Sequence, residues 1–521
     1  MRSFIAAAFV ISSLASADSG PGSCSGPAKR FAPGSGDWNG WGVDSSNSRY
    51  QPQPGLAATD VPKLKVKWAV GFAGMGDTRN QAQPVLVGGR VFVGSFSGKV
   101  YSLDAATGCI FWIYDAGVFV RGAINIQKMA GAGRSPWVAF FGDGKGAVHA
   151  VDAETGELVW RVQVDDFPVA RVSGTPTFYN GRVYVPMASG EEIASGQPKY
   201  ECCKFRGSLS ALDAKTGRVI WKSYTIPDPP KPYKVNAEGT QMYGPAGGGV
   251  WSSPTIDEKR KRVYVGTGNS FSGISLPTSD AILAYDLENG SLLWSSQAMP
   301  GDNWIPGCPK SASCPEDPGQ DYDFGSSPML KSLGGGKQVI VAAQKSGVVF
   351  GLDPDQRGKV LWKTRVGAGG AMFGGFVWGA ASADGAVYAA FGENAQGTAG
   401  APGLYALNIA TGAPLRTPAS AVVASGPAPL MPQALTAIPG FVFSGSLNGH
   451  LRAYSTRSGE VLWEFDALHD FETVNKVAAK GGSFNGGGAA VAHGIVVINS
   501  GFGFGGAKPG NVLLAFTVDG K

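Results

Sequence analysis

The sequence predicts an all-β fold, an eight-bladed β-propeller with four-stranded blades. A repeated hairpin motif and a tryptophan at a fixed place in that motif predict it, and the composition agrees. Glycine accounts for 78 of 521 residues, about twice the usual share, and only 16 % of residues are charged, as suits a large β protein with many tight turns. With 43 % hydrophobic residues and 13 tryptophans, the chain has enough apolar surface to exclude a disordered protein.

The repeated motif is a glycine, alternating apolar residues, an aspartate, a Thr-Gly pair and a tryptophan four residues after that second glycine. We interpret the alternating run as one strand, the "DAxTG" stretch as the turn, and the run into tryptophan as the next strand. Another alternating strand, such as "GRVFVGS", precedes each copy. The copies occupy residues 98–112, 146–160, 207–221, 281–294, 347–362, 403–415 and 449–463.

The tryptophans give the number of blades. Seven follow the pattern, and Arg416 stands where the sixth hairpin should have its tryptophan, which makes eight positions. We expect each tryptophan to dock between neighbouring sheets. The seven are Trp68, Trp112, Trp160, Trp221, Trp294, Trp362 and Trp463.

The two ends of the chain should complete one blade together. The strand that ends at Trp68 has no hairpin of its own, and the C-terminal strands "HGIVVINSG" and "NVLLAFTV" have no tryptophan strand after them. Pairing the N-terminal and C-terminal strands would close the ring and remove its free edges. The alternative is a two-sheet sandwich with internal duplications.

The chain divides into a signal peptide at 1–17, an N-terminal lead segment at 18–60 and the propeller at 61–521. Arg2, a short apolar run and Ala15-Ser16-Ala17 are typical of a cleavable secretory signal, although a buried N-terminal strand is an alternative. No later segment is apolar for long enough to cross a bilayer as a helix. We therefore expect a secreted or periplasmic protein with no membrane span. The net charge of +5 is spread along the chain, so nothing indicates nucleic-acid binding.

Long inserts between the third and fifth repeats mark the expected functional end of the propeller. Successive turn glycines are 48 residues apart from Gly108 to Gly156 but 73 apart from Gly217 to Gly290. The six cysteines should pair in an oxidising compartment. Cys308 and Cys314 are near enough to close a small loop, whereas the state of Cys24 and Cys109 stays open.

The repeats resemble those of the pyrroloquinoline-quinone (PQQ) alcohol dehydrogenases. The motifs "CCKFRG", "GGGVWSSPTID", "VGTGN", "DYDFGSSPML" and "QKSGVVFGLD" are similar to the polyvinyl-alcohol dehydrogenase branch, in the same order. The resemblance covers nearly the whole mature chain. It implies PQQ and Ca²⁺ as cofactors, because a flat, anionic quinone needs aromatic stacking, cations and a hard metal with oxygen ligands.

The resemblance also implies roles for particular residues. Those that match the family's metal ligands are Glu192, Asn269 and Asp323. Asp323 also matches the catalytic base, and Lys345 matches the cation beside the reactive carbonyl. Residues that match cofactor-binding positions are Trp251, Arg121, Ser173, Ser189 and the adjacent Cys202 and Cys203. Methanol-type relatives have a bonded cysteine pair over the quinone one blade earlier, so the resemblance implies a vicinal disulfide near the cofactor here.

Each assignment has a structural alternative. Glu191 could replace its neighbour Glu192 as ligand, Trp251 could be a core residue, and Asn269 could only cap a turn. Asp323 could be an ordinary loop carboxylate in the acidic stretch with Asp317 and Asp321, and Lys345 a solvated charge. Cys202 and Cys203 could instead form separate disulfides to Cys24 or Cys109.

Some positions depart from the methanol-type members of the family. Gln81 replaces a glutamate, and Val377 replaces an asparagine that contacts PQQ. The chain has no Cys-x-x-Cys-His motif, so we expect no haem c and a separate external electron acceptor of cytochrome or quinone type.

The expected reaction is oxidation of a secondary or polymeric alcohol by hydride transfer to PQQ. Two alternatives are a sugar or polyol dehydrogenase with the same cofactor and a non-catalytic propeller scaffold similar to outer-membrane assembly lipoproteins.

Overall fold

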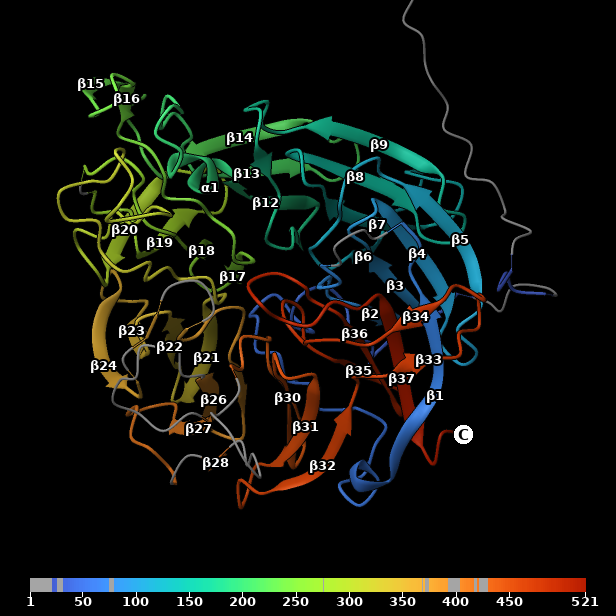
Figure 1. Ribbon diagram of the computed structural model, residues 1–521. Coiled ribbons are helices and arrows are strands. Elements are labelled where there is room, and N and C mark those ends of the chain that lie inside the picture. The colour runs from blue at the N-terminus through green and yellow to red at the C-terminus, as the bar shows by residue number, and fades with distance from the viewer. Residues whose placement is uncertain are drawn as a thin grey trace, which may run out of the picture.

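Eight four-stranded antiparallel sheets stand around one axis in the computed structural model of the chain (Figure 1). The structure describes residues 21–25, 31–74, 79–274, 276–367, 369–370, 374–391, 403–416, 419–420 and 430–521. The predicted all-β propeller with four-stranded blades is confirmed, and the predicted signal peptide at 1–17 lies outside the described residues.

The blades follow one another along the chain, each with its innermost strand first. The first four are β2 (Val85–Val87), β3 (Arg90–Gly94), β4 (Lys99–Asp104), β5 (Ile110–Asp115); β6 (Asn125–Lys128), β7 (Trp137–Gly142), β8 (Ala147–Asp152), β9 (Leu158–Gln163); β11 (Thr177–Tyr179), β12 (Arg182–Ser189), β13 (Ser208–Asp213), β14 (Val219–Tyr224), with β10 (Ala170–Arg171) also paired to β12; and β17 (Thr255–Asp257), β18 (Arg262–Gly266), β19 (Ala281–Asp286), β20 (Leu292–Gln297).

The next three are β21 (Met329–Gly334), β22 (Lys337–Gln344), β23 (Val348–Asp353), β24 (Lys359–Arg365); β25 (Ala381–Ala383), β26 (Ala386–Phe391), β27 (Gly403–Asn408), β28 (Ala419–Ser420); and β29 (Thr436–Ile438), β30 (Phe441–Gly445), β31 (His450–Ser455), β32 (Val461–Asp466). Outside the blades lie the pairs β15 (Lys231–Val235) with β16 (Gln241–Gly244) and β33 (Asp470–Phe471) with β34 (Ala479–Lys480), and the short helices η1 (Val61–Lys63) and α1 (Glu191–Ser195). Neither described helix is long and apolar enough to cross a bilayer.

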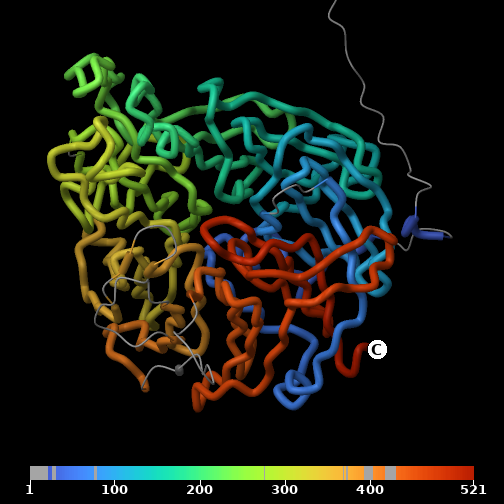
Figure 2. Tube along the Cα trace, in the orientation of Figure 1, coloured from blue at the N-terminus to red at the C-terminus, as the bar shows by residue number. Residues whose placement is uncertain are grey.

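The eighth blade joins the two ends of the chain, as predicted. It consists of β35 (Ala490–Ala492), β36 (Ile495–Ser500), β37 (Val512–Val518) and β1 (Leu64–Gly71). β1 pairs antiparallel to β37 from Leu64 opposite Val518 to Gly71 opposite Val512. Figure 2 shows the blue N-terminal strand beside the red C-terminal one. This pairing leaves no free sheet edge at the junction.

The repeated tryptophans dock between neighbouring blades. Trp112, from β5, donates its indole N–H to the carbonyl of Ala153 in the next blade's turn, at 3.2 Å. Gly156 of that turn has φ +76°, and a Cβ there would lie 2.7 Å from the Trp112 ring. The turn therefore needs glycine for its backbone and for the close approach of the indole. Arg416 takes this place in the sixth hairpin and reaches the Thr456 carbonyl at 3.5 Å.

The described part of the 18–60 lead segment lies along the inner strands. It makes backbone or side-chain hydrogen bonds to one blade after another. The contacts are Trp38 with Leu86, Asn39 with Ile126, Ser45 with Ile256, Ser46 with Leu330, Ser48 with Ser382, Arg49 and Gln51 with Ala437, and Pro54 with Gly494. The lead segment thus links seven blades.

Candidate active site

Two adjoining cavities, of about 480 and 200 Å³, lie where the loops before the inner strands meet the long inserts. Both are lined by Arg121, Arg171, Glu192, Lys345 and Trp378. The smaller cavity adds Ser173, Ser189, Trp251 and Asp323, and the larger adds Arg79, Gln81, Asp321, Trp304, Phe502 and Phe504. Most of the residues that the sequence singled out therefore share one site, although they come from four blades.

Three carboxylates form the centre of this site. Glu192, Asp321 and Asp323 each offer an oxygen, and these oxygens lie within 4.8 Å of one another. The ammonium of Lys345 donates to Asp321 at 2.7 Å and to Asp323 at 2.9 Å. Three acids face one lysine, so the cluster carries excess negative charge. Clustered carboxylate oxygens are the ligands that Ca²⁺ prefers.

The short helix α1 sends its two glutamates to different places. Glu192 joins the carboxylate cluster. Glu191 is fully buried and accepts hydrogen bonds from the backbone N–H groups of Lys204 and Phe205, at 2.8 and 2.7 Å, and from the Tyr200 hydroxyl at 3.0 Å. Glu191 is therefore committed to holding the 200–205 loop, and the alternative in which it replaces Glu192 is wrong.

Asn269 and Asp302 fix the two aspartates. The backbone N–H of Asn269 donates to Asp323 at 2.9 Å, and its side-chain amide nitrogen donates to the Trp304 carbonyl at 2.6 Å. Asp302 accepts backbone N–H bonds from Asp321 and Tyr322, at 3.3 and 2.7 Å, which orients the loop that presents Asp321. Asn269 thus lies beside Asp323, although it lines neither cavity.

Burial and mutual repulsion perturb the acids. Burial, and then the charges of Asp323 and Asp321, raise the pKa of Glu192 well above its ordinary value. Burial lowers the pKa of Lys345, but Asp321, Asp323 and Glu192 outweigh that effect and raise its pKa overall. Lys345 therefore stays charged. A bound cation would remove the repulsion that the lysine leaves uncompensated.

Two indoles form the apolar wall of the site. The rings of Trp251 and Trp378 meet edge to face, with centroids 5.2 Å apart and planes at 80°. The ammonium of Lys345 lies 5.3 Å from the centroid of the Trp251 ring. Gly325 leaves room for Trp251, because a Cβ there would lie 1.9 Å from the indole. Trp251 is half-buried and faces the cavity, so it offers a flat ring to a ligand.

Three positively charged side chains line the larger cavity and contrast with the carboxylates. They are Arg79, Arg121 and Arg171. Burial, then Arg171 and Arg79, lower the pKa of Arg121 to about 9. Arg121 lies over the Trp378 ring at 4.6 Å and donates to the Ser173 carbonyl at 3.3 Å. Three arginines that repel one another fit a ligand with several carboxylates.

Gln81 adds an unsatisfied acceptor at the same cavity. Its side-chain oxygen is buried and has no hydrogen-bond partner among the described residues. A buried amide oxygen without a partner is costly unless a ligand group donates to it. The indoles, arginines, acids and this acceptor together fit PQQ and a hard cation.

The six cysteines are all paired, as Cys24–Cys109, Cys202–Cys203 and Cys308–Cys314. The vicinal pair and the small loop agree with the sequence, and separate disulfides from Cys202 or Cys203 to Cys24 or Cys109 are wrong. Cys202 and Cys203 are fully buried within the loop that Glu191 holds, and neither lines the two cavities. The structure therefore does not bring them to the cavity walls.

Sequence reasoning missed Asp321 as a cluster member, together with Arg79, Arg171 and Trp378. Asp321 had a signal, because it lies two residues before Asp323 in the same acidic stretch. Arg79 and Arg171 had no such signal in the sequence, since each is an isolated cation in its own blade. Gln81 and Val377 were noted as departures, and both line the site.

The comparisons with known proteins agree with this architecture. Residues 38–368 match the family described as glucose/ethanol/alcohol dehydrogenase, beta-propeller domain, and residues 345–494 match outer membrane protein assembly factor BamB. Polyvinylalcohol dehydrogenases from Pseudomonas sp and Sphingopyxis sp. (strain 113P3) are 43 % and 38 % identical, each over 93 % of this chain and 77 % of the relative. Quinohemoprotein alcohol dehydrogenase from Comamonas testosteroni shares the fold, with a TM-score of 0.66 at 22 % identity over 93 % of this chain and 81 % of that one.

The chain belongs to the family of PQQ-dependent alcohol dehydrogenases. Its activity is the PQQ-dependent oxidation of alcohols, a reaction at CH–OH groups.

Proposed function

We propose that this protein is an exported dehydrogenase that oxidises a secondary or polymeric alcohol, similar to polyvinyl alcohol, with PQQ and calcium. The observation that carries the proposal is the buried cluster of Glu192, Asp321 and Asp323 on Lys345, beside the flat Trp251 ring. A structural propeller gains nothing from three crowded acids, because such a cluster costs stability without a cation.

The chemistry of each side chain in the site suggests which part of the cofactors it would bind. Glu192, Asn269 and Asp323 would hold the calcium, with Asp321 as a further carboxylate. Trp251 would lie against the quinone ring, while Arg121, Ser173 and Ser189, with Arg79 and Arg171, would hold the cofactor's carboxylates. When bound, PQQ would supply the hydride acceptor and calcium a Lewis acid.

The chain's own residues prepare the alcohol. Asp323 accepts the hydroxyl proton as general base, since it is fixed by the Asn269 N–H and Lys345. Lys345 keeps its positive charge next to the reacting atoms and stabilises negative charge that develops there. The indoles and the buried position exclude water from the site.

The larger cavity favours an alcohol with a hydrocarbon backbone. Beyond the acids, its wall contains Ile193, Trp304, Pro306, Phe502 and Phe504. These apolar groups would contact the methylene carbons of a secondary or polymeric alcohol while one hydroxyl reaches Asp323. A sugar presents hydroxyls on nearly every carbon. Its polar groups would therefore lie against this apolar wall.

Export and an external electron acceptor complete the proposal. The three disulfides, Cys24–Cys109, Cys202–Cys203 and Cys308–Cys314, suit an oxidising compartment. The electrons would leave to a separate cytochrome or quinone, as no haem c motif is present in the sequence.

The test is reconstitution of the purified protein with PQQ and CaCl₂, followed by dye reduction with polyvinyl alcohol and small secondary alcohols. Asp323→Asn should lower kcat by roughly 10²–10⁴-fold, because the base is lost. Asp317→Asn, an exposed acid of the same loop, is the matched control and should keep full activity. Calcium binding, followed by calorimetry, should weaken in Asp323→Asn and stay unchanged in the control.

The variant Asp321→Asn separates the roles of the two aspartates. If Asp321 acts as a metal ligand only, its loss should weaken calcium binding, and excess calcium should restore part of kcat. Full activity of Asp323→Asn would remove the proposed base, and failure of the wild-type protein to take up PQQ at micromolar concentration would refute the cofactor assignment.

A further inference from the structure

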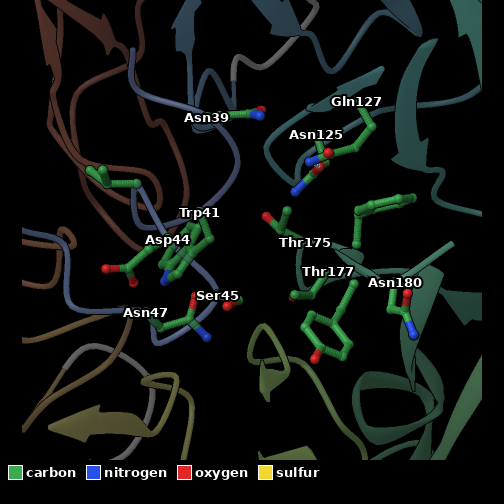
Figure 3. A pocket seen from close by; sticks show the side chains of 13 residues that line it. Asn39, Trp41, Asp44, Ser45, Asn47, Asn125, Gln127, Thr175, Thr177 and Asn180 are labelled. Carbon is green, nitrogen blue, oxygen red and sulfur yellow. Dashed lines mark hydrogen bonds between the residues drawn. The ribbon is translucent and has the colours of Figure 1, made fainter. Parts of the chain in front are cut away.

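A third cavity, of about 260 Å³, lies between the lead segment and the inner ends of two blades (Figure 3). Asn125 and Gln127 of β6, Thr175, and Thr177 of β11 form one side, and Trp41, Ser45 and Asn47 of the lead segment form the other. None of the described residues that line this cavity also lines either cavity of the candidate active site. The cavity is therefore separate from the candidate active site.

The cavity exists because the lead segment skips one blade. Its hydrogen bonds reach the inner strands of the other seven blades, but among the described residues none reaches β11. The third blade instead bonds to its neighbour, where the Thr177 hydroxyl donates to the Pro254 carbonyl at 2.8 Å. Between Asn39 and Ser45 the described lead segment makes no hydrogen bond to β11, and the cavity lies there. Thr175, Thr177 and Asn47 form a buried floor, and Asp44 and Asn180 form an exposed rim.

The lining offers neutral donors and acceptors. Gln127 donates to the Asn125 side-chain oxygen at 2.7 Å, which leaves the amide nitrogen of Asn125 as a donor and the amide oxygen of Gln127 as an acceptor. The Thr175 oxygen accepts from the Ala123 N–H at 2.8 Å, so its own hydrogen stays available. The indole N–H of Trp41 is buried and has no partner among the described residues.

Charge in the lining is almost absent. Among the described residues no lysine, arginine or histidine lines the cavity, and Asp44 is the one carboxylate. Asp44 already accepts from the Ser46 N–H and hydroxyl, at 3.0 and 2.7 Å. An anionic ligand would have no cation to bind, and a metal ion would have a single acid. The charge of the lining therefore excludes anionic ligands and metal ions.

An aromatic surface completes the lining. The Arg49 guanidinium lies 4.6 Å from the centroid of the Trp41 ring, and both Trp41 and the half-buried Phe178 line the cavity. Aromatic rings pack well against the C–H groups of a ligand, while its hydroxyls both donate and accept hydrogen bonds.

We propose that this cavity is a second binding site, for a neutral polyhydroxylated ligand. Two sources share that chemistry: a short segment of a poly-alcohol chain and a free sugar or small polyol. The ligand's hydroxyls bond to Asn125 and Gln127, and its carbons lie on the Trp41 and Phe178 rings. The site is independent of the quinone chemistry. Its test therefore does not depend on whether the proposed dehydrogenase reaction is correct.

The test is titration calorimetry on the full chain, loaded with PQQ and calcium but without an electron acceptor. A vinyl-alcohol oligomer and glucose are titrated separately. The double variant Asn125→Ala/Gln127→Ala should bind the true ligand at least roughly tenfold more weakly. Lys128→Gln, an exposed neighbour on the same strand that does not line the cavity, should bind as the wild type does. Turnover of a small secondary alcohol should be equal in all three proteins.

A second variant guards against misfolding. Trp41→Phe keeps one aromatic ring but loses the N–H and the second ring of the indole, so its affinity should fall less than that of the double variant, with a cooperative thermal melt that shows a folded protein. Selective loss of oligomer binding identifies the poly-alcohol segment, and selective loss of glucose binding identifies the free sugar. Unaltered binding in the double variant, or no binding of either probe at millimolar concentration, overturns the proposal.

Discussion

Asp280 shows how strongly the candidate site perturbs single residues. It is fully buried, and neither of its carboxylate oxygens has a hydrogen-bond partner among the described residues. Burial, and then the charges of Asp323, Asp302 and Asp321, raise its pKa well above the ordinary value. Its backbone is left-handed, with φ +47°, a conformation that both aspartate and asparagine tolerate. Asp280 is therefore a source of strain at the site.

The sign of the pH dependence follows from the raised pKa. A carboxyl whose pKa is higher in the folded state than in the unfolded state binds more protons when folded, so stability falls as the pH rises above the unfolded value. Asp280→Asn removes this cost and should raise the Tm of the cofactor-free protein at pH 7–8. The gain should vanish near pH ~4, the ordinary aspartate value, where the unfolded chain is itself half protonated. Melting curves at several pH values measure it.

The matched control is Asp384→Asn, an exposed aspartate that is also left-handed, at φ +51°. Its substitution should leave the melting temperature unchanged at both pH values. A lower Tm for Asp280→Asn at pH 7–8 would show that the ionised Asp280 has a stabilising partner, such as a bound cation.

At the scale of elements, a tryptophan and a turn glycine join most blades to the next, and Arg416 takes the tryptophan's place in the sixth hairpin. Trp112 is 2 % exposed and lies in the apolar layer between the first two blades. Its ring fills the space that Gly156 leaves, and its N–H satisfies the Ala153 carbonyl. The contact joins consecutive repeats, since the donor and the turn are 41 residues apart.

Truncation of this ring should measure the strength of the blade contact. Trp112→Ala removes a large buried side chain and a hydrogen bond, so the free energy of unfolding should fall by about 3–5 kcal/mol. Leu158→Ala, on the exposed face of β9, should change it by less than about 0.5 kcal/mol. Urea denaturation followed by fluorescence compares the two variants. Equal effects of the two substitutions would contradict the docking role.

At the scale of the molecule, the lead segment ties the ring together from inside. Arg49 is 1 % exposed, and its guanidinium donates to the carbonyls of Leu435 and Trp41 and to the Gln83 side chain. It also lies over the Trp38 and Trp41 rings. One side chain therefore joins the lead segment to the first and seventh blades.

Removal of Arg49 should destabilise the whole ring. Arg49→Ala leaves at least two buried carbonyls without a donor, each at a cost of about 1–3 kcal/mol, so the free energy of unfolding should fall by ~3 kcal/mol or more. The control is Arg134→Ala, an exposed arginine paired with Glu157 at 2.9 Å, which should cost at most about 1 kcal/mol. Calorimetric unfolding should show one transition in both variants. A wild-type Tm for Arg49→Ala would mean that the lead segment does not stabilise the ring.

The sequence by itself determined the ring. A hairpin of fixed period carries its own turn glycine and docking tryptophan, so eight positions and the closure of β1 on β37 follow from local pattern. Ordered motifs similarly predicted Glu192, Asp323, Lys345 and Trp251, which the cavities bring together. Each of these signals lies within a short stretch of chain.

Only the tertiary structure decided which side chains share the site. Glu191 and Glu192 are identical in type and adjacent, and they differ because the 200–205 loop offers free N–H groups to one of them. Arg79 and Arg171 join Arg121 only once three blades stand side by side, and Cys202–Cys203 lies in the core rather than on the cavity wall. Repeats fix the backbone through contacts between neighbours in sequence, whereas charge, burial and ligand geometry at the centre of the ring depend on residues from distant blades.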